Sequence, residues 1–398
     1  MFKWEYPGSG IIDDDMGYSY SRAYIVNTKA AGWVVIFGNG YDSVNGEAVL
    51  YVLDPTYGYP VATIHTGVFG CNGLSTPAVI DVDINGQIDL VYAGDLKGNM
   101  WKFDFSGPSV SDWKVAYDDN SVPMPLFTAK NANGDIQPIT SSPDVMKHCE
   151  QGLGGYIVVF GTGEYLGTPD FADTTVQSLY GIWDWGEPWV NLNNDQDEDN
   201  DKYYGYFKID RTLSNLDGNT NMTSAVQALT LLEQTIEYST ADYLVVSNNT
   251  IDYYNPTTDS GTNVGWYLDL TGFRERIIRD PIIRNGVALF VSSIPSSSPC
   301  SAGGQSVIYQ INACSGSRTD TSQFDVDLDG KYDSSDMITL PNGDKAAPSG
   351  QKINKMLYDP IIIKDRMYIN DATGSINNMP IPKILAGQFF WREIENNW

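Results

Sequence analysis

The stretch DVDINGQID carries oxygen-bearing side chains at alternate positions, with a glycine at its sixth position. Its donors, at positions 1, 3, 5, 7 and 9, are Asp81, Asp83, Asn85, Gln87 and Asp89. A calcium loop needs side-chain oxygens at positions 1, 3 and 5, glycine at 6, a main-chain carbonyl at 7 and another oxygen at 9 or 12. The stretch therefore predicts a Ca²⁺ site, and the alternative is an Asx-rich hairpin turn that needs no metal.

Position 12 of this loop is Tyr92, where an EF-hand has glutamate, and the next residues, IDLVYAGD, have the length and composition of a strand. We therefore expect the ion to lie between two strands, with Asp89 completing its shell.

The same pattern recurs in the stretch DVDLDGKYDSSD, which has an acidic residue at position 12. Its candidate ligands are Asp325, Asp327, Asp329, the carbonyl of Lys331, Asp333 and Asp336. Two matches in one chain are harder to obtain by chance than one. Three or four carboxylates held this close repel one another, so a bound ion is expected to order each loop. The acidic tract holding Asp195, Asp197, Asp199 and Asp201 lacks the glycine, and a solvated loop is the simpler interpretation.

The elements that would hold these loops are short apolar segments such as GWVVIFGNG, GYIVVFGTG and GVALFVSS, which have the length of β-strands. A second pattern recurs among them, in which an aromatic residue precedes Asp or Asn and a turn closes on glycine. The anchors are Asp54, Asp104, Asp184, Asp269, Asn312 and Asp371. The aromatic residue is expected to pack between sheets while the anchor accepts hydrogen bonds from its own turn. This spacing favours an all-β propeller over a sandwich.

Two segments interrupt the strand pattern. The stretch at residues 222–247 is ambiguous between helix and strand, and the polar tract at 189–202 is expected to loop outward.

The charge of the chain is strongly negative, at -26 from 50 acidic and 24 basic residues. Such a surface repels nucleic acid and anionic lipid, and cations or basic surfaces are better partners. No apolar run reaches the roughly 18 to 20 residues of a membrane span. The first residues do not resemble a signal peptide, so we expect either that an export signal has been removed or that the chain is part of something longer.

The four cysteines suggest bridges and an oxidising compartment. Cys300 and Cys314 bracket a Gly/Ser-rich turn, which predicts a disulfide between them, and Cys71 with Cys149 forms a second, weaker candidate. The alternative is four reduced thiols.

The sequence offers little for catalysis. Only His65 and His148 could serve as imidazole bases or zinc ligands, and each is interpreted as a surface or packing residue. Dinucleotide and phosphate-loop motifs are absent. We therefore expect no enzyme.

Several ordered stretches, among them NGLSTPAVIDVDINGQIDLVYAGDLKGNMWKFDFSG, IVVFGTGEYLG, PCSAGG and FFWREIE, resemble one family. They are similar to the C-terminal propeller domain of the PilY/PilC proteins of type IV pilus biogenesis and tip adhesion. The resemblance covers nearly the whole chain, and it implies one modified seven-bladed propeller domain over residues 1–398, whose first blades are missing from this chain. A second chain or a preceding segment would then complete the propeller.

The resemblance also implies a function. In this family a calcium loop that corresponds to residues 81–89 controls pilus extension and retraction, which implies an extracellular position at the pilus tip and contact with minor pilins. The family's adhesive N-terminal half is missing here. Two other functions remain open: a quinone-dependent dehydrogenase-like propeller, and a glycan-binding propeller that uses exposed aromatic residues.

Overall fold

The computed structural model describes residues 3–8, 10–119, 121–184, 230–255, 258, 260–296 and 303–382. Strands dominate these ranges, and they fall into two compact units. Unit 1 comprises Met1–Pro143 and Asp184–Ala228, and unit 2 comprises Asp144–Trp183 and Leu229–Trp398. The acidic tract at 189–202, Cys300 and the final FFWREIE stretch lie outside the described residues. Within the described ranges, no helix has the length and hydrophobicity of a transmembrane span.

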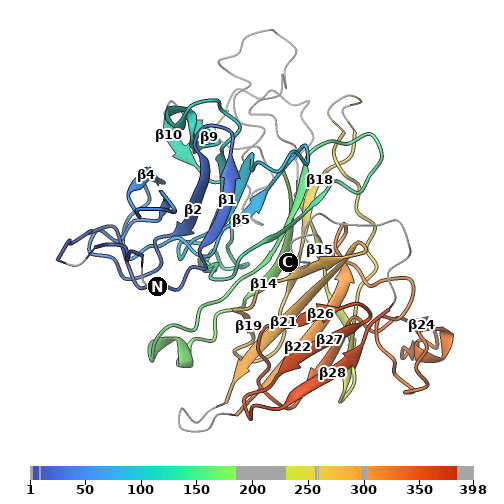
Figure 1. Cartoon of the computed structure of the whole chain (residues 1–398). Coiled ribbons are helices and arrows are strands. Elements are labelled where there is room, and N and C mark those ends of the chain that lie inside the picture. The colour runs from blue at the N-terminus through green and yellow to red at the C-terminus, as the bar shows by residue number, and fades with distance from the viewer. Residues whose placement is uncertain are drawn as a thin grey trace. The chain divides into compact units, whose positions relative to one another are not determined.

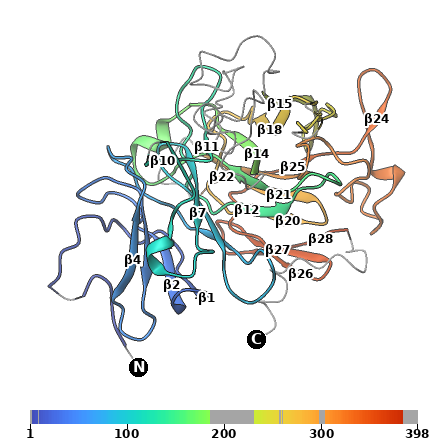
Figure 2. The ribbon, with the colours of Figure 1, turned by 90° about the horizontal axis from the view of Figure 1, so that it is seen from above.

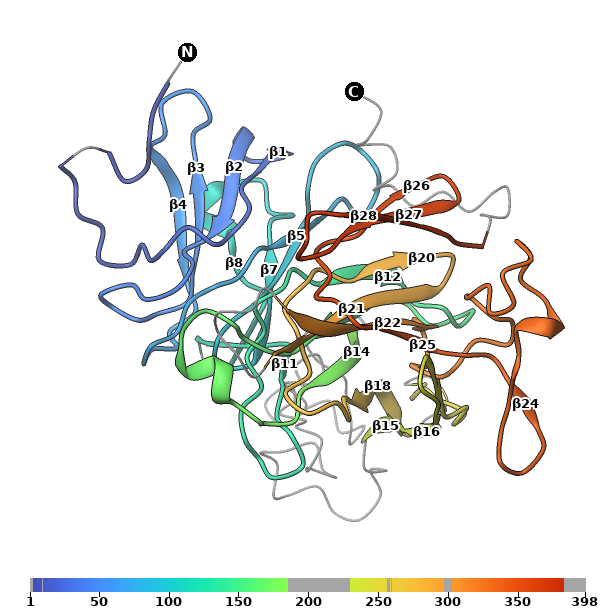
Figure 3. The same ribbon diagram turned by 90° about the horizontal axis from the view of Figure 1, so that it is seen from below.

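The first sheet of unit 1 is a four-stranded antiparallel meander, whose strands are drawn in blue in Figure 3. Its strands in order are β1 (Tyr24–Thr28), β2 (Gly32–Gly38), β3 (Val49–Leu53) and β4 (Pro60–His65). All five residues of β3 are buried, whereas only one residue of β4 is. Inner strands that are covered on both faces need continuous apolar runs, and VLYVL supplies one.

The second sheet of unit 1 holds the first acidic loop, between β5 and β6. Its strands are β5 (Ala78–Ile80), β6 (Leu90–Gly94), β7 (Asn99–Asp104), β8 (Lys114–Val115) and β11 (Phe127–Thr128). A separate hairpin joins β9 (Tyr117–Asp119) to β10 (Val122–Met124), and η1 (Val110–Asp112) is a 3₁₀ turn. One apolar cluster, which includes Ile36, Leu50, Val91 and Trp101, packs between the two sheets and fixes the base of the loop.

The opposite face of the first sheet is covered by the N-terminal segment. Trp4, Tyr6 and Met16 pack on a cluster that includes Phe37 and Tyr51. The Trp4 indole N–H also donates to the Pro55 carbonyl at 3.0 Å. The segment is therefore held against the sheet by both apolar contact and hydrogen bonding.

Unit 1 also contains a buried ion pair. The Lys102 ammonium lies 2.8 Å from the Asp184 carboxylate, and the two side chains are 5% and 0% exposed. The hydroxyls of Tyr92 and Tyr117 donate to the same carboxylate. Burial alone would raise the pKa of Asp184, but the Lys102 charge and these hydrogen bonds outweigh it and lower that pKa.

Unit 2 contains two larger sheets and a three-stranded one, seen from two sides in Figures 1 and 2. The first runs β12 (Asp144–Lys147), β13 (Tyr156–Gly161), β14 (Ser178–Asp184), β18 (Asn263–Asp269) and β15 (Thr230–Gln234). The last residue of β14, Asp184, is counted with unit 1. The second runs β16 (Ile236–Ser239), β17 (Tyr243–Val246), β25 (Gly350–Ile353), β22 (Gly304–Asn312), β21 (Val287–Pro295) and β19 (Arg276–Ile277), with β20 (Ile282–Arg284) beside β21. The third runs β26 (Ile361–Ile363), β27 (Arg366–Asn370) and β28 (Ile376–Pro380).

The remaining elements of unit 2 are small: η2 (Pro169–Ala172), η3 (Ser334–Asp336), and the hairpin of β23 (Ile338–Thr339) and β24 (Lys345–Ala346). An apolar cluster that includes Val291, Ile308 and Ile369 packs β21 and β22 against β27. The ambiguous segment at 222–247 forms strands β15, β16 and β17 over its described part.

The repeated aromatic-to-Asp turn is confirmed in part. The side chains of Asp54, Asn312 and Asp371 each accept hydrogen bonds of 2.7–3.2 Å from N–H groups two to four residues further on. The closing glycines of these three turns are left-handed, with φ between 69° and 81°. The pattern differs at Asp269, which accepts the Ser178 hydroxyl, and at Asp184, which forms the ion pair. The aromatic residues are buried as expected at Tyr51, Trp101, Tyr180, Trp266 and Tyr309.

Candidate metal sites

The first acidic loop connects β5 to β6 in unit 1. Asp81 directly follows β5 and Asp89 directly precedes β6. One carboxylate oxygen each from Asp81, Asp83 and Asp89 lies within 4.8 Å of the others. The strand pair therefore brings both ends of the loop together. Three of the five ligands predicted from the sequence lie close to one another.

The backbone of this loop wraps around its own side chains. The Asn85 and Gly86 N–H groups donate to Asp81 at 3.1 and 2.6 Å, and the Gln87 N–H donates to the Asn85 side-chain oxygen at 2.8 Å. Ile84 and Gly86 are left-handed, with φ of 60° and 84°. Asn85 and Gln87 thus lie in the same turn as the three acidic residues, and their role as ligands stays a prediction.

Asp89 is half-buried at the end of the loop. Its Oδ2 accepts the Val82 N–H at 2.8 Å. Burial raises the pKa of Asp89, and the negative charges of Asp83, Asp81 and Asp104 raise it further. A cation among these oxygens would relieve that repulsion.

The second acidic loop follows β22 in unit 2. Oxygens of Asp325, Asp327 and Asp336 lie within 4.8 Å of one another. Asp336 ends η3, is fully buried and accepts the Val326 N–H at 2.6 Å. In this loop the residue at position 12, Asp336, belongs to the cluster of carboxylates. In the first loop the residue at position 9, Asp89, does so instead.

The two loops share a backbone conformation. In the second loop Leu328 and Gly330, again at positions 4 and 6, have φ of 62° and 81°. The Gly330 N–H donates to Asp325 Oδ2 at 3.0 Å. Asp325 Oδ1 is buried and has no hydrogen-bond partner among the described residues. Leaving such an oxygen unsatisfied costs about 1–3 kcal/mol, more when it is charged, so this atom favours a ligand in the loop.

Two predicted ligands of the second loop have other partners. Asp329 forms an ion pair with Lys331 at 2.8 Å, which lowers the pKa of Asp329. Asp333 accepts the Ser335 N–H at 2.9 Å and caps η3. Neither belongs to the close cluster, and the carbonyl role of Lys331 stays a prediction.

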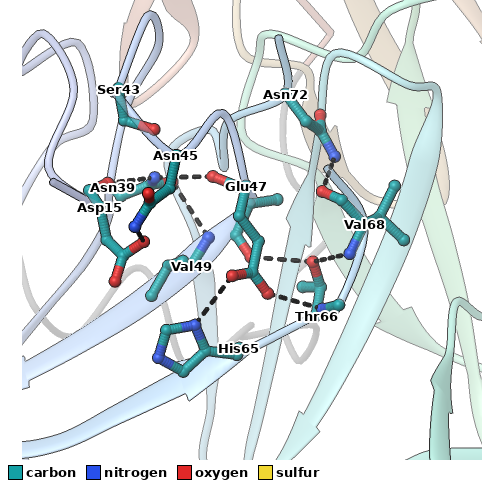
Figure 4. A network of polar contacts seen from close by, with 12 residues as sticks. Asp15, Asn39, Ser43, Asn45, Glu47, Val49, His65, Thr66, Val68 and Asn72 are labelled. Carbon is teal, nitrogen blue, oxygen red and sulfur yellow. Dashed lines mark hydrogen bonds and ion pairs between the residues drawn. The ribbon is translucent and has the colours of Figure 1, made fainter. Parts of the chain in front are cut away.

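A third cluster joins residues that the sequence did not connect. Asp15, Glu47 and His65 of unit 1 each offer a ligand atom, and these atoms lie within 4.8 Å of one another (Figure 4). We interpreted His65 as a surface or packing residue from the sequence. The acidic run Asp13–Asp15 is visible in the sequence, but nothing in its spacing connects it to Glu47 or His65.

His148, the other histidine, lies in unit 2 and packs on aromatic rings. Its ring centroid is 4.7 Å from that of Trp183 and 4.5 Å from that of Tyr253. Burial lowers the pKa of His148 to about 4. The expectation that His148 is a packing residue is confirmed.

The predicted disulfide pairing is wrong. Cys314 is bonded to Cys149, with 6.1 Å between their Cα atoms, so it cannot pair with Cys300. Cys71 is an exposed free thiol, which also excludes the Cys71–Cys149 bridge. The turn between Cys300 and Cys314 suggested a local bridge, but β22 separates its ends, and the fold brings Cys149 to Cys314 over 165 positions.

Comparison with known proteins identifies the family. Residues 5–191 match the model of the PilY1 beta-propeller domain. A type IV pilus biogenesis factor PilY1 homolog of Xylella fastidiosa is 32% identical over 322 residues, which are 76% of this chain and 19% of that protein. PilY1 of Pseudomonas aeruginosa (strain UCBPP-PA14) is 31% identical over 362 residues, 83% of this chain and 29% of that protein.

The fold has a close structural counterpart. The crystal structure of the Pseudomonas aeruginosa PilY1 C-terminal domain superimposes with a TM-score of 0.72 and 26% identity, and covers 93% of this chain and 74% of that one. This confirms the all-β propeller class. The chain spans less than a third of the length of these two curated relatives. The sequence matches and the shared fold agree, and the chain belongs to the family of PilY1 β-propeller domains.

Proposed function

We propose that this chain is a calcium-binding, non-enzymatic propeller that acts in type IV pilus biogenesis, in tip capping and in adhesion, outside the cell. Two observations support the proposal: membership of the PilY1 family, and two loops that gather three carboxylates each. The observation that carries the calcium part is the buried, unpartnered oxygen of Asp325 in a loop with the calcium pattern.

The ligands in both loops are oxygens, which is the donor set that hard cations such as Ca²⁺ prefer. Two carboxylates about 4 Å apart repel by roughly 1 to 4 kcal/mol, depending on how well water screens them. A divalent ion converts this repulsion into attraction and fixes the loop ends relative to each other.

In the first loop, the ion would connect the end of β5 to the start of β6 through Asp81 and Asp89. The loop also carries an exposed apolar residue, Ile84, which is 68% exposed, and Leu328 at the same position of the second loop is 84% exposed. Calcium would thus order an exposed apolar tip on each loop separately. We propose that the tip of the first loop engages minor pilins and sets the balance of pilus extension and retraction.

Calorimetry with Ca²⁺ tests the metal sites. We expect uptake with dissociation constants of about 10⁻⁴–10⁻³ M, the range of extracellular calcium modules. Asp89→Ala should weaken uptake at the first loop, and Asp325→Asn, which preserves side-chain shape, should weaken it at the second. Asp320→Asn is the matched control, because Asp320 is exposed and lies just before the second loop, outside its cluster.

The cellular part is tested by placing Asp89→Ala in the full-length protein and measuring surface pili. Calcium affinity and pilus display should fall together. Absence of heat and of bound calcium at millimolar ion in the unmutated protein would refute the metal mechanism. Normal calcium dependence of pilus display with Asp89→Ala would refute the regulatory role.

A further inference from the structure

The cluster of Asp15, Glu47 and His65 lies in unit 1 and shares no residue with the two calcium loops. Glu47 is buried, at 3% exposure, whereas the His65 side chain is 48% exposed. His65 Nδ1 lies 3.0 Å from Glu47 Oε2. A buried carboxylate thus meets an imidazole that solvent, and therefore an ion, can reach (Figure 4).

The strand register explains why these residues meet. His65 is the last residue of β4 and is paired with Val49 of β3. Glu47, two residues before Val49, is the diagonal neighbour of His65 on the same face, because side chains two apart on an extended chain point the same way. Asp15 arrives from the N-terminal segment, whose main chain is bound there: Asn39 Nδ2 donates to the Asp15 carbonyl at 2.7 Å.

Hydrogen bonds from outside the cluster orient both carboxylates. The Gly67 N–H donates to Glu47 Oε1 at 2.7 Å, and Asn45 Nδ2 donates to Asp15 Oδ1 at 2.7 Å. One oxygen of each carboxylate is thus held by an amide N–H from outside the cluster. Such outer hydrogen bonds are typical of metal sites, where they fix the ligands before the ion arrives.

The donor set differs from that of the acidic loops. One imidazole nitrogen with two carboxylate oxygens suits Zn²⁺ and similar transition metals, whereas all-oxygen sites suit calcium. Two ligand atoms that each lie about 2.0–2.1 Å from one ion are roughly 2.9–3.4 Å apart from each other. The 3.0 Å between His65 Nδ1 and Glu47 Oε2 falls within this range. Two carboxylates against one histidine also leave negative charge for a cation to neutralise.

We propose that Asp15, Glu47 and His65 form a binding site for a zinc-class divalent transition metal, which fastens the N-terminal segment to the first sheet. The segment already contacts that sheet through Asp13, whose Oδ2 accepts the hydroxyl of Tyr51 in β3 at 2.8 Å. The ion adds a bond between the end of this segment and the β3–β4 hairpin. The proposal is independent of the calcium function.

The test is Zn²⁺ titration of the whole chain in saturating Ca²⁺, followed by NMR of the ¹⁵N-labelled imidazoles. The chain has only two histidines, so the spectrum contains only His65 and His148. We expect one equivalent of Zn²⁺ to bind and to shift the His65 nitrogens, while those of His148 stay unchanged. The unfolding temperature of the protein should rise with Zn²⁺ concentration, because the ion binds only the folded state.

Two variants make the test specific. His65→Ala should weaken this Zn²⁺ binding at least tenfold, because a direct ligand is lost, while an unchanged circular dichroism spectrum shows that the variant is still folded. Asp14→Asn should leave it unchanged, since Asp14 is an exposed neighbour in the same acidic run but lies outside the cluster. Unchanged His65 resonances at excess Zn²⁺, or equal affinity in His65→Ala, would overturn the proposal.

Discussion

His148 should make unit 2 sensitive to mild acid. Its Nδ1 accepts the Glu150 N–H at 3.1 Å, so the neutral ring carries its proton on Nε2. That Nε2 is buried and has no hydrogen-bond partner among the described residues. A second proton would have to displace the Glu150 contact and put a charge beside the rings of Trp183 and Tyr253, which explains why burial lowers the pKa of His148 to about 4.

The sign and size of the effect follow from proton linkage. An unfolded histidine titrates near 6.5, so between about pH 6.5 and pH 4 the unfolded chain binds the proton and the folded chain does not. The free energy of unfolding therefore falls as pH drops through this window and levels off below it. The full shift from 6.5 to about 4 would remove about 2 kcal/mol between pH 7 and pH 5, and partial exposure of the ring reduces this to about 1 kcal/mol.

Urea unfolding at pH 7 and pH 5 measures this loss in the wild type and in His148→Phe, which retains an aromatic ring in the same packing. We expect the variant to lose about 1 kcal/mol less than the wild type on acidification. Titration of the two imidazoles by NMR gives the pKa of His148 directly. A pKa above 6, or the same pH dependence in both proteins, would refute the reasoning.

Two further predictions concern stability. Lys102→Met should destabilise unit 1 by about 3–5 kcal/mol in urea unfolding, because it leaves the buried Asp184 charge without its ionic partner. Adding Asp184→Leu should restore part of this loss, since it removes the charge but also the acceptor of the Tyr92 and Tyr117 hydroxyls, and additive losses would contradict the reasoning. Cys149→Ser with Cys314→Ser should lower the unfolding free energy by about 2–5 kcal/mol, because the bridge closes a loop of 165 positions, whereas Cys71→Ser should have no effect; equal stability of the two variants would count against the bridge.

The fold class could be predicted because its signals are local. Strand length, buried aromatic residues and the turn at Asp54, Asn312 and Asp371 depend on neighbours within a few positions, and the structure reproduces them. The partners of Asp184 and the bridge between Cys149 and Cys314 could not be predicted in this way. Both depend on strands that meet in space after long stretches of chain, and sequence spacing carries no information on that pairing.

The candidate sites also differ in whether local sequence or tertiary structure brings their residues together. Each acidic loop is encoded locally, because its left-handed glycine, its alternating Asp residues and the strand pair or 3₁₀ turn that closes it lie within a few positions of one another. The cluster of Asp15, Glu47 and His65 has no such code, because it needs the register that pairs His65 with Val49 and the path of the N-terminal segment. A histidine judged alone is best interpreted as a surface residue, and only the strand pairing gives it ligand partners. Zn²⁺ titration of His65 therefore tests a site that depends on tertiary structure, whereas calcium uptake tests sites that a short sequence already specifies.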